Sequence, residues 1–151
     1  MAHPAIFDLD VYVEARANRL RNLFCALGDR SFNEMRILEV GCGLGDLGEA
    51  FVARGSTVVS IDARPEFVKG VRAKYPNRQC EVMDHENWQP SHLGHFDAIL
   101  CFGLLYHLSQ PTAFMRSCAA LSNELWRETL VGDATEAKYL VVPEYGDDQE
   151  H

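Results

Sequence analysis

The sequence predicts an α/β protein with a Rossmann-like, doubly wound, mostly parallel sheet of strand order 3-2-1-4-5. Three observations support this fold class. Short apolar runs rich in β-branched residues alternate with segments of helical spacing. The first such run ends in a glycine-rich turn, and acidic residues directly follow the second and third runs. In this class of fold, the loops at the carboxyl ends of the strands form a binding edge.

A single domain with a sizeable core is the expected organisation. The chain has 151 residues, of which 47% are hydrophobic and 24% are charged, and these values are ordinary for a globular domain. The formal net charge of −8 repels phosphate backbones. Binding of nucleic acid is therefore disfavoured, and a small molecule is the favoured partner.

The cysteines and the apolar runs indicate a cytoplasmic protein. The five cysteines are an odd number without C-x-x-C spacing, which favours small buried residues in a reducing compartment. No apolar run approaches the ~18 residues of a membrane span, and no secretion signal is expected at the N-terminus. His85, His92 and His95 lack the spacing of a metal site, so no metal is expected.

The first expected element is an amphipathic helix over Asp10–Leu27, within an N-terminal helical segment of residues 1–35. Arg16 and Arg19 should lie on its solvated side, and Tyr12 at its exposed end. The helix should pack on the sheet or cover the binding edge. Its apolar side comprises Val13, Ala17, Leu20, Leu23, Phe24 and Leu27.

Residues 36–48 organise the rest of the chain. Ile37, Leu38 and Val40 form a short apolar run, as expected for a strand buried on both faces of a parallel sheet. The loop that follows opens a helix, whose first N–H groups point back over the glycines. Glycines recur at alternate positions, where the backbone needs a positive φ or lies against a ligand, namely at Gly41, Gly43 and Gly45.

The same glycines admit two ligands. Gly43, Gly45 and Gly48 also satisfy the dinucleotide pattern G-x-G-x-x-G, which alone is weak. A pyrophosphate favours a loop free of negative charge, whereas this loop lies between Glu39 and Asp46. An acid at the end of the strand suits a ligand that brings a cation there.

Asp62 is the second strong signal. It ends a β-branched run over Thr57–Ile61, about 20 residues after the glycine loop. An acid at this position of a βαβ unit accepts hydrogen bonds from ribose hydroxyls. Asp62 therefore predicts a cofactor that carries a nucleoside. Capping of the next helix, in which Pro65 suits the first turn, is compatible with this role.

The remaining elements complete the sheet. Because the crevice of such a sheet lies where strand order reverses, between strands one and four, Cys101–His107 should meet the glycine loop. We expect a helix over Glu66–Tyr75, a strand over Gln79–Met83, a loop with one short turn over Glu86–His95, a central strand over Phe96–Phe102, a helix from Ser109 to about Ser122, and a fifth strand over Glu124–Val131.

These motifs resemble those of class I S-adenosylmethionine-dependent methyltransferases. Residues 39–45 match the acid-x-Gly-x-Gly-x-Gly motif of that family, and residues 102–108 resemble its fourth motif in small-molecule and some RNA-modifying members. The tetrad used to methylate amino groups of nucleic-acid bases is absent from the sequence. The resemblance covers about residues 36–133 and implies a methyltransferase core with S-adenosylmethionine as cofactor and a small-molecule acceptor.

The resemblance also implies roles for single residues. Glu39 would lie near the cofactor's amino group, through water or backbone. Asp84 would accept from the adenine amino group, with His85 beside the ring. Tyr106 and His107 are the candidates for positioning the acceptor. His107 could also act as general base, or could merely hold backbone at the start of a helix. The complete predicted cofactor set is Glu39, Gly41, Cys42, Gly43, Gly45, Asp62, Ala63, Asp84, His85, Phe102 and Gly103.

Two other functions stay open. One is a nicotinamide-dependent oxidoreductase with Asp62 on the ribose, and the other is a cofactor-binding or regulatory protein that has lost catalysis. The second is motivated by the end of the chain, because this family usually adds a helix and an antiparallel strand pair there. We expect residues 134–151 to be a short extension with an acidic tail, so that the pair is missing or truncated. An uncovered fifth strand then favours a homodimer through that edge.

Overall fold

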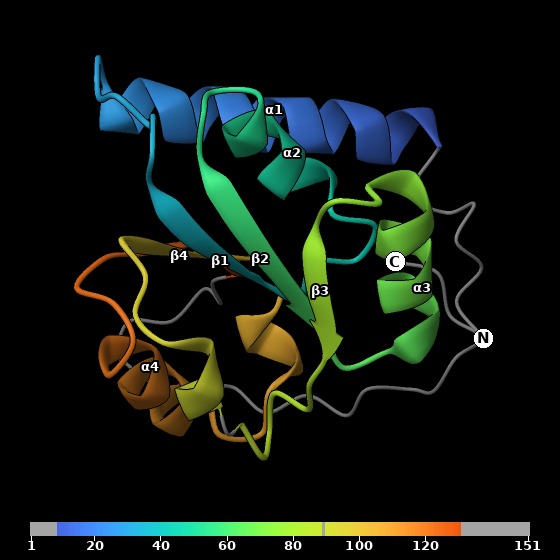
Figure 1. The fold of residues 1–151 in the computed structure, drawn as a ribbon, viewed down its shortest axis with the longest axis vertical. Helices are drawn as coiled ribbons and strands as arrows, with labels where there is room; N and C mark the ends of the chain where they lie inside the picture. The colour runs from blue at the N-terminus through green and yellow to red at the C-terminus, as the bar shows by residue number, and fades with distance from the viewer. Residues whose placement is uncertain (1–8, 89, 131–151) are drawn as a thin grey trace.

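The computed structural model describes residues 9–88 and 90–130. Within these residues it has a five-stranded parallel sheet of order β3-β2-β1-β4-β5 (Figure 1). The predicted fold class and strand order are confirmed. The strands are β1 (Arg36–Val40), β2 (Thr57–Asp62), β3 (Gln79–Val82), β4 (Ala98–Phe102) and β5 (Leu125–Glu128).

Helices cover both faces of the sheet. Helices α1 and α2 lie on one side and α4 on the other (Figure 1). None of the helices in the described part of the chain combines the length and apolar character needed to cross a membrane. The helices are α1 (Asp10–Leu27), α2 (Asp46–Val52), α3 (Pro65–Lys74) and α4 (Pro111–Ala119), with 3-10 turns η2 (Pro90–Leu93) and η3 (Leu105–His107).

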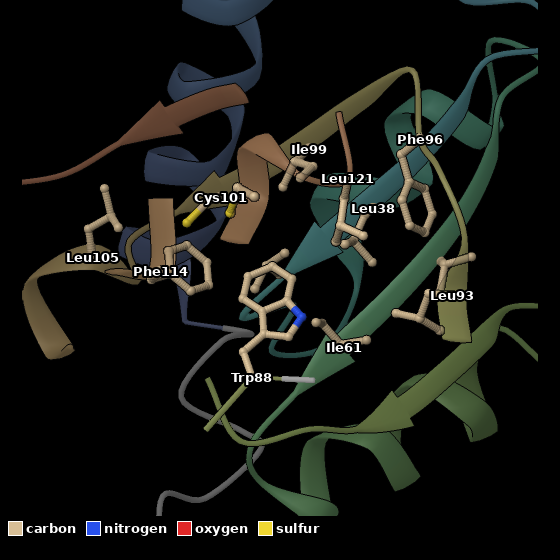
Figure 2. Packing of buried hydrophobic residues seen from close by; sticks show 13 residues of the cluster. Leu38, Ile61, Trp88, Leu93, Phe96, Ile99, Cys101, Leu105, Phe114 and Leu121 are labelled. Carbon is tan, nitrogen blue, oxygen red and sulfur yellow. The ribbon is translucent and has the colours of Figure 1, made fainter. Parts of the chain in front are cut away.

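Each face of the sheet buries its own apolar cluster. Successive residues of β1 face opposite sides: Ile37 joins the cluster under α1 and α2, and Leu38 joins the cluster under α4. In the cluster under α4, Trp88 packs against Phe114 with ring centroids 4.5 Å apart (Figure 2). Phe51 of α2 packs on the opposite face. This two-sided burial fixes the positions of the strand ends, where the site lies.

Only the second half of α1 packs on the sheet. Its residues from Leu20 to Leu27 contact the cluster around Phe51, whereas Val13 is 43% exposed and Ala17 is exposed. The helix therefore packs on the sheet only from Leu20 onward, and its first half extends past the sheet. The reason is length, since α1 has 18 residues and the underlying α2 has seven. At about 1.5 Å per residue, α1 extends well beyond its support.

Several element boundaries differ from the predicted ones by up to three residues. β4 begins at Ala98 rather than Phe96, although Asp97 N still donates to Arg36 O of β1 at 2.8 Å. β5 also ends earlier than predicted. The predicted extension over residues 134–151, with its acidic tail, lies outside the described residues.

Candidate active site

The glycine loop and Asp62 meet at the carboxyl ends of β1 and β2. Gly43 N donates to Asp62 Oδ2 at 2.9 Å, and Cys42 N donates to Ile61 O at 3.1 Å. The other oxygen of Asp62 accepts from Arg64 N at 3.0 Å, and Asp62 is only 3% exposed. The two strongest sequence signals therefore form one hydrogen-bonded unit.

The bare faces of two loop glycines are covered by the protein's own side chains. A Cβ atom on Gly41 would lie 3.3 Å from three carbon atoms of Leu104, and one on Gly45 would lie 3.2 Å from Val71. Both glycines have positive φ angles, 66° and 76°. Backbone conformation and close packing thus both require glycine at these positions. The expectation of a ligand against them stays a prediction.

Glu39 lies beneath the loop rather than on its open side. It is 2% exposed, Oε1 accepts from Gly48 N at 2.8 Å, and Oε2 accepts from Ser60 Oγ at 2.7 Å. Burial raises the pKa of Glu39 to about 6, although these hydrogen bonds and Arg78 oppose the rise. The carboxylate supports the loop from below. Its predicted contact with a cofactor amino group through water or backbone remains untested.

Arg78 completes this buried polar cluster, and sequence analysis missed it. The Nη1 atom lies 3.2 Å from Ser60 Oγ and 3.6 Å from Glu39 Oε2, and Nη2 donates to Glu49 Oε2 at 2.5 Å. The Arg78 side chain is 3% exposed. The one signal in the sequence was Glu39, an acid inside an apolar strand. A buried charge of this kind needs a partner of opposite charge.

Asp84 and His85 follow β3 and differ in environment. Asp84 is exposed, and hydrogen bonds from the Asn87 side chain and Glu86 N lower its pKa. His85 is 6% exposed, and burial lowers its pKa, so its imidazole is neutral near pH 7. Within the described residues neither ring nitrogen of His85 has a hydrogen-bond partner. Buried polar atoms of this kind are rare and mark candidate ligand contacts.

A cavity of about 220 Å³ adjoins His85. It lies between the segment 85–88 and α4, and Phe114 and Gln110 form part of its wall. Trp88, which also lines it, has its indole between Phe114 and Ile61 (Figure 2). The cavity therefore lies on the α4 side of the sheet, beside the end of β3.

Three side chains from distant parts of the chain converge just beyond β4. A Cβ atom on Gly103 would lie 3.4 Å from Tyr106 Oη and 3.6 Å from Arg19 Nη2. Arg19 also forms an ion pair with Glu128 at 3.2 Å, at the end of β5. Tyr106 is 44% exposed, and its ring centroid is 4.3 Å from that of His107. Sequence analysis predicted Tyr106 and His107 here but missed Arg19 and Glu128.

Helix α1 is held at this edge by two arginines. Arg16 pairs with Asp46 at 3.0 Å, at the first turn of α2, and Arg19 pairs with Glu128. The expectation that these arginines are merely solvated is therefore wrong. Each arginine pairs with an acid on a different side of the candidate site. The order of residues along the sequence does not reveal these pairs.

Three other predicted cofactor residues have side chains that lie in different surroundings. The Cys42 side chain packs among Val68, Val71 and Cys80, and Phe102 packs against the cluster under α1 and α2. Ala63 is exposed beside Asp62. Across residues 9–88 and 90–130, no group of three or more His, Cys, Asp or Glu side chains is arranged to hold a metal ion.

A parallel sheet with a glycine loop after its first strand and an acid after its second defines α/β proteins that bind nucleoside-containing cofactors. The family model described as "Methyltransferase domain" matches residues 12–125. The chain belongs to this family, and its fold is that of the class I S-adenosylmethionine-dependent methyltransferases. This membership leaves the nicotinamide-dependent alternative unsupported.

Two curated relatives are similar to the core of the chain. Both are named ubiquinone biosynthesis O-methyltransferase, and they come from Xanthomonas axonopodis pv. citri (strain 306) and Xanthomonas euvesicatoria pv. vesicatoria (strain 85-10). Over 95 residues they are 38% and 39% identical to this chain. Each alignment covers 57% of this chain and 38% of the relative. The matched region thus spans well under half the length of these relatives.

Two solved structures share the fold. The N-terminal domain of EvdMO1 with SAH bound has a TM-score of 0.63 and 28% identity, and the match covers 74% of this chain and 48% of that one. Magnesium protoporphyrin IX methyltransferase (ChlM) from Synechocystis PCC 6803 with bound SAM also has a TM-score of 0.63, with 18% identity. That match covers 76% of this chain and 57% of ChlM, and it shows the shared fold alone.

Proposed function

We propose that this chain binds S-adenosylmethionine and transfers its methyl group to a hydroxyl oxygen of a small-molecule acceptor. The observation that carries the proposal is the hydrogen bond from Gly43 N to Asp62 Oδ2, 2.9 Å long. It brings the glycine loop and a buried carboxylate to the same edge of the sheet. Oxygen as the accepting atom is supported by the two O-methyltransferases among the relatives.

The residues at this edge fit the parts of an adenosyl cofactor. Asp62 retains lone pairs that can accept from ribose hydroxyls. His85 has two buried nitrogens without a partner among the described residues, and an adenine ring presents both donors and acceptors to such a group. Asp84, exposed beside it, would accept from the exocyclic amino group. The loop from Gly41 to Gly45 would lie along the methionine part.

The chain's own contribution to catalysis would be alignment and removal of a proton. The bound cofactor supplies an electrophilic methyl group on a sulfonium. Tyr106 would orient the acceptor hydroxyl, and His107 would take its proton as general base. Holding the reacting centres in line accounts for most of the acceleration in a reaction with so good a leaving group. No covalent intermediate with the chain is needed.

Calorimetry tests the cofactor. The wild-type chain should bind S-adenosylhomocysteine and not NAD. The Asp62→Ala variant should lose about 100-fold or more in affinity, because two hydrogen bonds to a charged group are removed. Asp29→Ala, at an exposed position, is the matched control and should bind normally. Unchanged affinity in Asp62→Ala, with circular dichroism showing an intact fold, would remove Asp62 from the ribose site.

Transfer of a labelled methyl group tests the reaction. Phenols and catechols are suitable acceptors for a first panel, and His107→Gln should lower turnover about 100-fold without changing the affinity for S-adenosylhomocysteine. Binding without turnover across the panel would favour the alternative of a cofactor-binding protein that has lost catalysis.

The domain organisation, the oligomeric state and the compartment are further parts of the proposal. Residues 1–35 would cover a core of residues 36–133. β5 is an edge strand of the described sheet, and pairing of two such edges would give a homodimer, which light scattering can detect. All five cysteines are free thiols, as expected of a cytoplasmic protein.

A further inference from the structure

We infer that Arg78 is a positioning residue for the cofactor loop. It holds Glu39 in its ionised form beneath the loop and thereby keeps the turn from Gly45 to Gly48 in the shape that binds cofactor. The inference rests on the proposed cofactor site. Arg78 itself is not placed in contact with cofactor or acceptor, and it would act through Glu39 and the loop backbone.

Arg78 joins four parts of the chain beneath the loop. Its Nη1 atom lies 3.5 Å from Gly45 O in the loop, 3.2 Å from Ser60 Oγ in β2, and 3.6 Å from Glu39 Oε2 in β1. Its Nη2 atom donates to Glu49 in α2. The planar guanidinium presents five donors in a fixed geometry, so these partners are held together as one unit.

Glu39 transmits this arrangement to the end of the loop. Its Oε1 atom accepts from Gly48 N at 2.8 Å, in the first turn of α2. The fit is close, because a Cβ atom on Gly48 would lie 2.6 Å from Glu39 Oε2 and 2.9 Å from Arg78 Nη1. Gly48 therefore leaves room for the ion pair beneath it. The beginning of the loop is fixed separately, through Gly43 and Asp62.

Only an ionised Glu39 can serve all of these donors. Its two carboxylate oxygens face Gly48 N, the Ser60 hydroxyl and the Arg78 guanidinium. A protonated carboxyl has one oxygen that must itself donate, and this conflicts with a site made of donors. Without Arg78 the buried negative charge would be uncompensated, and Glu39 would take up a proton instead.

The other ionisable groups around Glu39 do not replace Arg78. Asp46 and Glu49 of α2 are acids, and the thiols of Cys42 and Cys80 lie on the side of α3. The charge of Asp46 works against ionisation of Glu39, whereas that of Arg78 favours it. A loss of Arg78 should therefore make cofactor binding sensitive to pH in the neutral range.

The test is calorimetry with S-adenosylhomocysteine between pH 5.5 and 8.5. At pH 7 the Arg78→Met variant should bind about tenfold more weakly than wild type, and Arg78→Lys should recover part of the loss. The midpoint at which affinity falls on acidification should move upward by about one pH unit in Arg78→Met. Glu49→Gln is the matched control: it removes the more exposed partner of Arg78 and should change affinity less than about twofold.

A double-mutant cycle separates positioning from general damage. In Glu39→Gln, removal of Arg78 should have at most a twofold effect, because no buried charge remains to be compensated. An equal tenfold loss in both backgrounds would overturn the inference. So would an unchanged pH midpoint in Arg78→Met or, if that variant does not fold, in Arg78→Gln, which also removes the positive charge. Absence of binding by the wild-type chain would refute the cofactor site itself, and the inference with it.

Discussion

Arg78 and Arg19 show how differently the two sides of the glycine loop are built. Each arginine pairs with a glutamate, but the Arg78 side chain is 3% exposed and the Arg19 side chain is 34% exposed. Beneath the loop, the charges are desolvated and hydrogen-bonded to several partners. Beside Gly103, where the acceptor would lie, they remain in contact with water. The ion pair that supports the loop is therefore buried, whereas the ion pair beside the proposed acceptor position is partly exposed.

Truncating each arginine gives the largest expected difference. Arg78→Met should lower the free energy of unfolding by about 3–5 kcal/mol, because it breaks a buried ion pair and Glu39 must then take up a proton at neutral pH. Arg19→Met should cost less than about 1 kcal/mol, as is usual for ion pairs near the surface. Urea denaturation measures both values. Equal losses would show that the two sides are energetically alike.

The pH dependence of stability should isolate Glu39. Its pKa is raised from an ordinary value of 4.5 to about 6 in the folded chain, so the folded chain holds this proton more tightly than the unfolded one. Protonation of Glu39 therefore stabilises the folded chain. This contribution to the free energy of unfolding is fully present below pH 4.5 and is lost as pH rises through 6. The loss should be about 2 kcal/mol.

The matched variant for this measurement is Glu39→Gln, which cannot titrate. The difference in unfolding free energy between wild type and Glu39→Gln should change by about 2 kcal/mol between pH 4.5 and 7.5. Other acids titrate in both proteins and cancel. A difference that is independent of pH would mean that the pKa of Glu39 is not raised in the folded chain.

Filling the space beside the buried ion pair should have a smaller effect. Gly48→Ala gains about 1 kcal/mol of helix propensity, but its Cβ atom would collide with Glu39 and Arg78, at a cost of about 1–3 kcal/mol. A net loss of about 1 kcal/mol is expected. Gly70→Ala in α3 is the control, because its Cβ atom would lie 2.9 Å from Leu44 Cδ2 alone, the end of a flexible side chain that can move aside. It should stabilise or be neutral in thermal denaturation.

Salt should produce the smallest difference. Raising NaCl from 0.05 to 0.5 M should erase most of the small stability difference between wild type and Arg19→Met, a few tenths of a kcal/mol. The difference between wild type and Arg78→Met should hardly change, since the buried pair is shielded from ions. Denaturation curves at the two salt concentrations give both values. A salt response of the Arg78 pair would indicate that water reaches it.

The fold and half of the site could be predicted because their signals are local. A strand, a glycine turn and a following helix are contiguous in the sequence, and Asp62 directly follows its strand. The contact from Gly43 to Asp62 then follows from topology alone, since parallel neighbours end at the same edge. The bounds of α1 were likewise predictable from helical spacing.

The rest depends on partners that are distant in the sequence. Nothing near Arg78 shows that its side chain passes beneath α2 to Glu39, and nothing near Arg19 indicates Glu128. How much of α1 is buried could not be predicted either, because spacing shows which side is apolar but not how far its support extends. For Glu39, sequence analysis assumed that an acid at a strand end faces a ligand. Its carboxylate contacts Ser60, Gly48 and Arg78, which are not apparent from the sequence, and the contact with a cofactor stays a prediction.

The two arginines of α1 lie one helical turn apart and fasten the first helix to both rims of the crevice. Asp46 belongs to the rim formed by the glycine loop, and Glu128 belongs to the opposite rim at β5. The rims cannot separate without releasing one of these pairs. A chain that began after Leu27 would lack both of these ion pairs, and the two rims would be joined through the sheet alone.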